Sequence, residues 1–123
     1  MPISRHRFWG IATLAGIAAL LFGFGSTPAS AGLIDAPWDK LLHLALFATL
    51  TVALRLALPR LPLAMIASLA IGFALADELH QAWVPGRHPD WGDGLADLAG
   101  IAGGLLIWPG LVRRLPGSAA EAG

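Results

Sequence analysis

The feature that most constrains the fold of this chain is a set of four long apolar runs. The first, residues 8–25, has no ionisable side chain, and the others cover residues 41–58, 61–76 and 94–112. A helix needs about 20 mainly apolar residues to cross the hydrocarbon core of a bilayer. Only 13% of the residues are charged, against about one-quarter in an ordinary soluble domain. The sequence therefore predicts an all-α fold, an integral membrane bundle of four transmembrane helices, in one domain over residues 1–123.

The first apolar run has a second interpretation as a signal peptide. Basic residues precede it, and an A-x-A pattern follows it at residues 29–31. Its apolar core of about 17 residues is longer than the usual secretory core of about 7 to 15. We expect an uncleaved helix, with cleavage as the alternative.

The charges predict how the bundle is oriented in the membrane. Cytoplasmic loops of membrane proteins carry an excess of Lys and Arg. With both termini cytoplasmic, six basic residues lie inside and two outside, whereas seven of the eight acidic residues lie outside. The inner basic residues are Arg5, Arg7, Arg55, Arg60, Arg113 and Arg114. We therefore expect a multi-pass protein of the bacterial cytoplasmic (inner) membrane, with a disordered tail at residues 115–123.

The unusual polar residues gather at the extracytoplasmic ends of the last three predicted helices. Side chains three or four positions apart share one face of a helix. Such pairs are Asp39 with His43, Glu78 with Gln81, and Asp93 with Asp97. Gly100 and Gly104 continue the face that carries the last pair, and small residues at this spacing let two helices approach closely. That face of the fourth helix is predicted to pack against its neighbours.

Three motifs in this region resemble those of a known family. "DKLLHLALFATL", "DELHQAWVPGR" and "DGLADLAGIAGG" resemble the VanZ-like family, whose members carry D-K-x-x-H, then E-x-x-Q with a P-G-R turn, then D-x-x-x-N. The resemblance covers about residues 37–105. It implies a membrane bundle of the cell envelope and a link to glycopeptide (teicoplanin) resistance, but not a defined reaction. The family positions fall on Asp39, Lys40, His43, Glu78, Gln81, Arg87 and Asp93, and Asp97 stands where the pattern has Asn.

We predict Glu78 as the centre of a site, because a carboxylate below the membrane surface is costly unless it faces protein or water. If the protein is an enzyme, Glu78 and His43 are the expected acid/base pair. The residues expected to bind a ligand or to organise the site are Asp39, Lys40, Gln81, Arg87, Asp93 and Asp97. Asp77, His80, His88 and Asp90 are expected to face lipid head groups or water.

The sequence gives little support for a metal site, a cofactor, serine hydrolysis or nucleic-acid binding. No H-E-x-x-H or comparable spacing is present, so neither a metal site nor a cofactor is predicted. The five serines lie outside the polar motifs, which disfavours serine hydrolysis, and the zero net charge predicts no nucleic-acid partner. The expected partners are membrane lipids and a lipid-linked or lipophilic ligand, in an oligomeric state that the sequence leaves open.

Three functions stay open at this point. The first is an outward-facing polar site that binds an envelope lipid, a glycolipid or a lipophilic glycopeptide. The second is a membrane enzyme that acts on a lipid-linked substrate at the outer leaflet. The third is a small cation-coupled transporter. The third has the least support, because no ionisable residue marks a path through the predicted inner halves of the helices.

Overall fold

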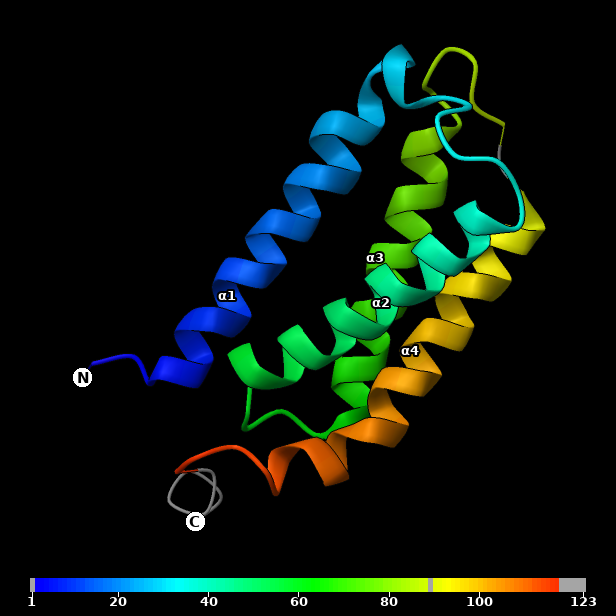
Figure 1. Cartoon of the computed structure of the whole chain (residues 1–123). Helices are drawn as coiled ribbons and strands as arrows, with labels where there is room; N and C mark the ends of the chain where they lie inside the picture. The colour runs from blue at the N-terminus through cyan, green and yellow to red at the C-terminus, as the bar shows by residue number, and fades with distance from the viewer. Residues whose placement is uncertain (1, 89, 118–123) are drawn as a thin grey trace.

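The computed structural model describes residues 2–88 and 90–117, and these residues form helices without any strand. The long helices are α1 (Arg5–Ala18), α2 (Trp38–Ala57), α3 (Leu63–Gln81) and α4 (Trp91–Val112) (Figure 1). A π-helical segment, η1 (Ala19–Gly23), and a 3-10 turn, η2 (Phe24–Ser26), continue α1, and a second 3-10 turn, η3 (Pro28–Ser30), follows. All four spans are long and apolar enough to cross a membrane, which confirms the predicted bundle. Of the tail predicted to be disordered, residues 118–123 lie outside the described part.

The helices extend further toward the polar end than the apolar runs alone suggested. The third predicted span ends at residue 76, whereas α3 continues to Gln81, and α4 begins at Trp91 rather than at residue 94. Their charged ends are therefore helical. The polar motifs are held on rigid elements rather than on loops.

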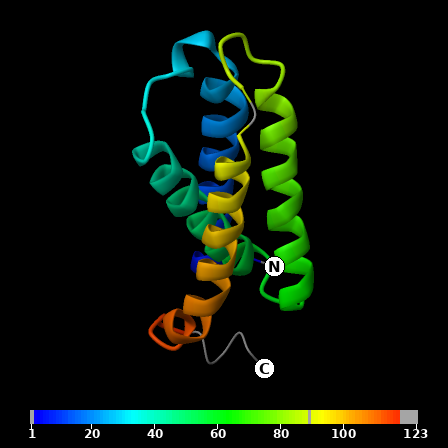
Figure 2. The same ribbon diagram turned by 90° about the vertical axis from the view of Figure 1, so that its right-hand side faces the viewer.

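The centre of the bundle is α2, which runs obliquely between α1 and α4 (Figure 1 and Figure 2). Glycines make both contacts close. A Cβ atom on Gly10 would lie 2.7 Å from the backbone nitrogen of Ala57, and one on Gly104 would lie 2.9 Å from the carbonyl oxygen of Ala48. Gly100 is packed still more tightly against the backbone of α2. The predicted packing face of α4 is thereby confirmed.

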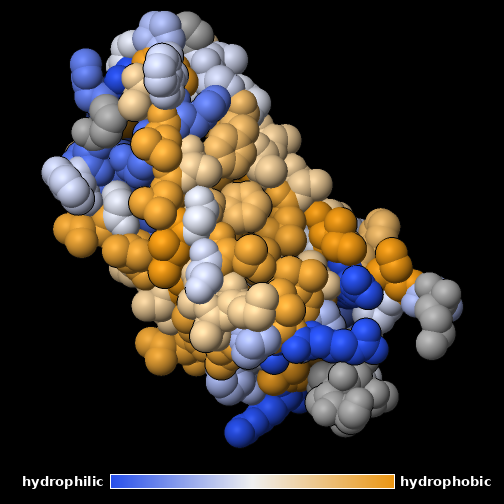
Figure 3. Space-filling model, turned by 180° about the vertical axis from the view of Figure 1, so that it is seen from behind, coloured by the Kyte–Doolittle hydropathy of each residue, from blue (hydrophilic) through white to orange (hydrophobic). Residues whose placement is uncertain are grey.

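The core is small and the apolar surface is large. Phe47 and Leu50 of α2 and Ile66 of α3 are fully buried, whereas Leu79 is 68% exposed and Leu106 is 80% exposed. The hydrophobic surface lies over the middle of the bundle, and hydrophilic residues gather toward its two ends (Figure 3). This distribution is typical of a protein whose solvent is lipid along most of its length.

The two ends of the bundle differ in charge. His6 Nε2 lies 2.6 Å from the carbonyl oxygen of Pro116, so the start of α1 and the end of α4 meet at one end, where the six arginines expected inside also lie. The connections from α1 to α2 and from α3 to α4 lie at the other end (Figure 1). That second end carries the acidic side chains and is called the acidic end below.

Candidate functional site

Three helix ends bring polar side chains together at the acidic end. The Asp90 side chain caps α4 by accepting a hydrogen bond from Gly92 N at 2.9 Å, a usual role for Asp at a helix start. Acidic residues in the first turns of α2 and α4 also suit the positive ends of these helix dipoles. The polar side chains so placed are Asp39, Lys40 and His43 on α2, Asp77 and Gln81 on α3, and Asp93 and Asp97 on α4.

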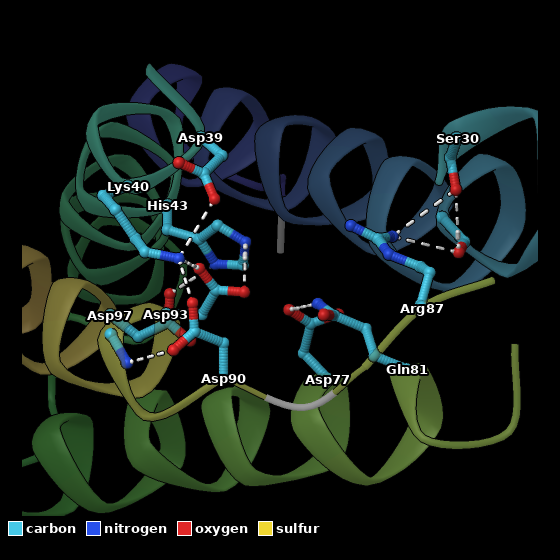
Figure 4. Close-up of polar contacts among 12 residues, drawn as sticks. Ser30, Asp39, Lys40, His43, Asp77, Gln81, Arg87, Asp90, Asp93 and Asp97 are labelled. Carbon is cyan, nitrogen blue, oxygen red and sulfur yellow. Dashed lines mark hydrogen bonds and ion pairs between the residues drawn. The ribbon is translucent and has the colours of Figure 1, made fainter. Parts of the chain in front are cut away.

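Lys40 ties the beginning of α2 to the beginning of α4. Its ammonium group donates hydrogen bonds to Asp39 Oδ2 at 3.0 Å, Asp90 Oδ2 at 2.5 Å and Asp93 Oδ1 at 2.6 Å (Figure 4). The bond from Lys40 lowers the pKa of Asp90 below its ordinary value. Asp90 therefore has a partner although its side chain is 52% exposed. Lys40 and its three carboxylates organise this side of the site.

His43 lies between the two acidic residues of α4. Its Nδ1 is 2.8 Å from Asp97 Oδ1, and its Nε2 is 3.8 Å from Asp93 Oδ2. The short contact fits an Nδ1–H that donates to Asp97, which leaves Nε2 free to accept or release a proton. His43 is buried and Asp97 is 0% exposed. Asp97, which departs from the family pattern, therefore supplies the carboxylate that orients the imidazole ring.

On α3 the structure places Asp77, not Glu78, among these residues. Asp77 is 1% exposed and accepts a hydrogen bond from Gln81 Nε2 at 2.9 Å. The expectation that Asp77 faces head groups or water is wrong. It lies on the buried stripe of α3 that runs through Ile66, Ala70 and Ala74, since these positions recur every three or four residues. Because α3 is almost uniformly apolar before Asp77, the sequence alone does not mark this stripe.

Glu78 is half-buried and lies one position away from the stripe. Its Oε1 atom is buried without a hydrogen-bond partner. The central role predicted for Glu78 stays a prediction, and the expected pairing of Gln81 with Glu78 is replaced by a bond to Asp77.

Arg87 forms its hydrogen bonds with the segment after α1 and not with the acidic residues. Its Nη1 atom donates to the carbonyl oxygen of Gly25 at 3.2 Å and lies 3.4 Å from Ser30 Oγ (Figure 4). Gly86 before it has φ +83°, which suits glycine in the P-G-R turn. Arg87 thus fastens the α3–α4 connection to the segment after α1. Ser30 was not a predicted site residue, since nothing in the sequence indicated that contact.

A pocket of about 370 Å³ opens among these elements. Its polar lining comes from Ser30, Asp35, Asp39, His43, Asp77, Gln81, Arg87, His88 and Asp93. Its apolar lining comes from Leu20, Leu21, Phe24, Leu33, Ile34, Leu42 and Leu46. The contribution of η1 and η2 to the pocket lining was not predicted, because the sequence of an uncharged apolar run does not show which residues it contacts.

Three polar residues of the acidic end also meet a geometric requirement for a metal site. His43, Asp77 and Asp97 each offer one ligand atom, and the three atoms lie within 4.8 Å of one another. The expectation of no metal site rested on linear spacing, which cannot detect ligands that come singly from three helices.

Comparison with known proteins supports the resemblance seen in the motifs. A family model described as VanZ/LLP1 matches residues 5–113, a range that includes all four helices and every site residue named above. No curated protein and no solved structure matches the chain. The matched range and the four apolar spans make this a multi-pass membrane protein. Because the match covers most of its length, the chain belongs to the VanZ/LLP1 family.

Proposed function

We propose that this protein binds an envelope lipid, a glycolipid or the lipophilic part of a glycopeptide in the pocket at its acidic end. The observation that carries the proposal is the mixed lining of that pocket, which combines charged and polar side chains with a set of large apolar ones. Ligand sites are mostly apolar cavities with a few polar groups that fix orientation. Such a lining suits an amphiphile.

The position of the apolar lining favours a ligand that arrives from the membrane. Leu20, Phe24 and Leu42 line the pocket and are each more than 40% exposed. In this proposal the apolar part of the lining is continuous with the surface that the helices present to lipid. A volume of about 370 Å³ is near the lower end of the range for small-molecule sites. We expect the pocket to hold a head group or one part of a larger ligand.

The orientation of the pocket is part of this proposal. The arginines at the opposite end make that end cytoplasmic by the positive-inside rule, so the pocket faces the extracytoplasmic side of the bacterial inner membrane. A ligand from the cell envelope is consistent with that position. It is also consistent with the association with glycopeptide resistance that the family resemblance implies.

Native mass spectrometry of the protein, extracted gently from bacterial membranes, tests the proposal. We expect one amphiphile to be retained on the wild type and to be lost from Leu42→Trp, because the indole fills part of the pocket. Leu79→Trp is the matched control, since Leu79 is exposed on α3 and does not line the pocket. Retention that is equal in both variants, or no retention above bulk lipid, would overturn the proposal.

One observation favours catalysis as a second candidate. His43 lines the pocket, and a buried carboxylate holds its ring at 2.8 Å, as expected for a general base oriented by a second group. In this alternative the substrate is lipid-linked and His43 moves the proton. Turnover of the retained amphiphile by purified wild type, and its loss in His43→Gln, would select catalysis over binding alone.

A further inference from the structure

We infer that His43, Asp77 and Asp97 together bind one divalent transition-metal ion. They come from α2, α3 and α4, and their ligand atoms lie within 4.8 Å of one another. All three residues are buried. A set of one imidazole and two carboxylates from three different helices is a composition that zinc and manganese sites use.

The distances are close to those of a filled site. Atoms that bind one zinc ion at about 2.0–2.2 Å lie about 3 to 3.5 Å from one another. His43 Nδ1 and Asp97 Oδ1 are already 2.8 Å apart, and the third ligand atom, from Asp77, lies no more than 4.8 Å from the other two. To bind one ion, the Asp77 atom must therefore come at most about 1–2 Å closer to the other two.

A second observation points independently to a missing cation. Asp97 is 0% exposed, and its Oδ2 atom is buried without a hydrogen-bond partner. Asp77 accepts its hydrogen bond from the neutral amide of Gln81. Within residues 2–88 and 90–117, no lysine or arginine forms an ion pair with either carboxylate. Lys40 bonds to three other acids, and Arg87 bonds to Gly25 and Ser30.

Positive charge stabilises the ionised form of such a cluster. A buried carboxylate without a counter-charge is strongly disfavoured, and two carboxylates in one site cannot both ionise easily. A protonated His43 would compensate one of them. A divalent ion would compensate both and would also give Asp97 Oδ2 a partner.

The ligand atoms select the class of metal. Imidazole nitrogen with carboxylate oxygen suits zinc or manganese, whereas calcium and magnesium take mainly oxygen ligands. Three protein ligands leave at least one coordination position open. His43 and Asp77 also line the pocket, so an anionic oxygen of the bound amphiphile, such as a phosphate oxygen, can occupy that position. This last step rests on the proposed function, but metal binding itself does not.

The test uses purified protein in detergent, without a histidine tag, stripped with a chelator and titrated with Zn²⁺ and Co²⁺. We expect saturable binding of one ion per chain by calorimetry and elemental analysis, and a Co²⁺ absorption band typical of nitrogen and oxygen ligands. Asp77→Asn, Asp97→Asn and His43→Gln should each weaken binding more than tenfold. Asp90→Asn is the matched control, because Asp90 is a carboxylate at the same end of the bundle that lies outside the set and does not line the pocket. It should bind as the wild type does.

Two outcomes would overturn the inference. One is the absence of saturable binding by the wild type, which needs no variant and holds even if a substitution impairs folding. The other is unchanged affinity in all three ligand variants. Loss of metal binding with the amphiphile still retained would remove the metal site and leave the proposed function standing. Metal binding without a retained amphiphile would leave the metal site standing and overturn the proposed function.

Discussion

A single added methyl group tests the contact on which the geometry of the site depends. In Gly104→Ala the new Cβ would lie 2.8 Å from Thr51 Cβ and 2.9 Å from the carbonyl oxygen of Ala48, whereas carbon atoms in contact lie about 3.5–4.0 Å apart. Thr51 is buried and its hydroxyl donates to the carbonyl oxygen of Phe47 at 2.7 Å, so its side chain has little freedom to move away. Either α4 shifts away from α2 or the contact is strained. Such overpacking costs about 1–3 kcal/mol.

The matched control is the neighbouring glycine. A Cβ on Gly103 meets nothing within 4 Å, so Gly103→Ala should be neutral or gain up to about 1 kcal/mol from helix propensity. Both variants are compared with the wild type by denaturation in mixed detergent, followed by far-UV circular dichroism. If Gly104→Ala is as stable as Gly103→Ala, the close packing of α4 on α2 is wrong.

Three further changes test the polar network. Lys40→Met should destabilise the protein by about 1–3 kcal/mol, because three carboxylates lose the cation they share; equal thermal stability with the wild type would show that the network contributes nothing. The bond from Lys40 lowers the pKa of Asp90. The ionised Asp90 carboxylate therefore contributes fully to the stability of the folded protein above the ordinary pKa of 3.8, and this contribution is lost as the pH falls through the lowered pKa. Asp90→Asn should therefore be less stable than the wild type at neutral pH and should show a smaller further loss on acidification to about pH 3, whereas parallel pH profiles would contradict this role. Arg87→Gln should speed hydrogen exchange in residues 25–32, because Arg87 bonds to Gly25 and lies near Ser30; unchanged exchange would mean that it does not hold this segment.

The membrane fold was predictable because its determinant is local. Runs of about 20 apolar residues have few alternatives in a bilayer, so the four spans could be identified without knowledge of their packing. The packing face of α4 was also visible, since Gly100 and Gly104 mark it, but the sequence did not show that α2 is the helix it meets. The clustering of acids at one end was predictable too. They lie at the start of α2, the end of α3 and the start of α4, and successive crossings of the membrane bring these three helix ends to the same side.

The identity of the buried carboxylate on α3 was harder to predict. Asp77 and Glu78 are adjacent and chemically alike, so only the rotation of α3 decides which one is buried. That rotation is set by packing against α2 and α4 and by the continuation of α3 to Gln81. Nor could spacing along the chain reveal a three-residue cluster assembled from three helices.

The central claim is that the pocket faces the extracytoplasmic side, and cysteine labelling tests it most directly. The chain contains no cysteine, so single substitutions can be labelled without background. Ile34→Cys is placed in the pocket lining and Arg60→Cys in the exposed α2–α3 connection at the opposite end. In spheroplasts treated with a membrane-impermeant maleimide, we predict labelling of Ile34→Cys, with Arg60→Cys labelled only after permeabilisation. The reverse pattern would place the pocket in the cytoplasm and contradict the account.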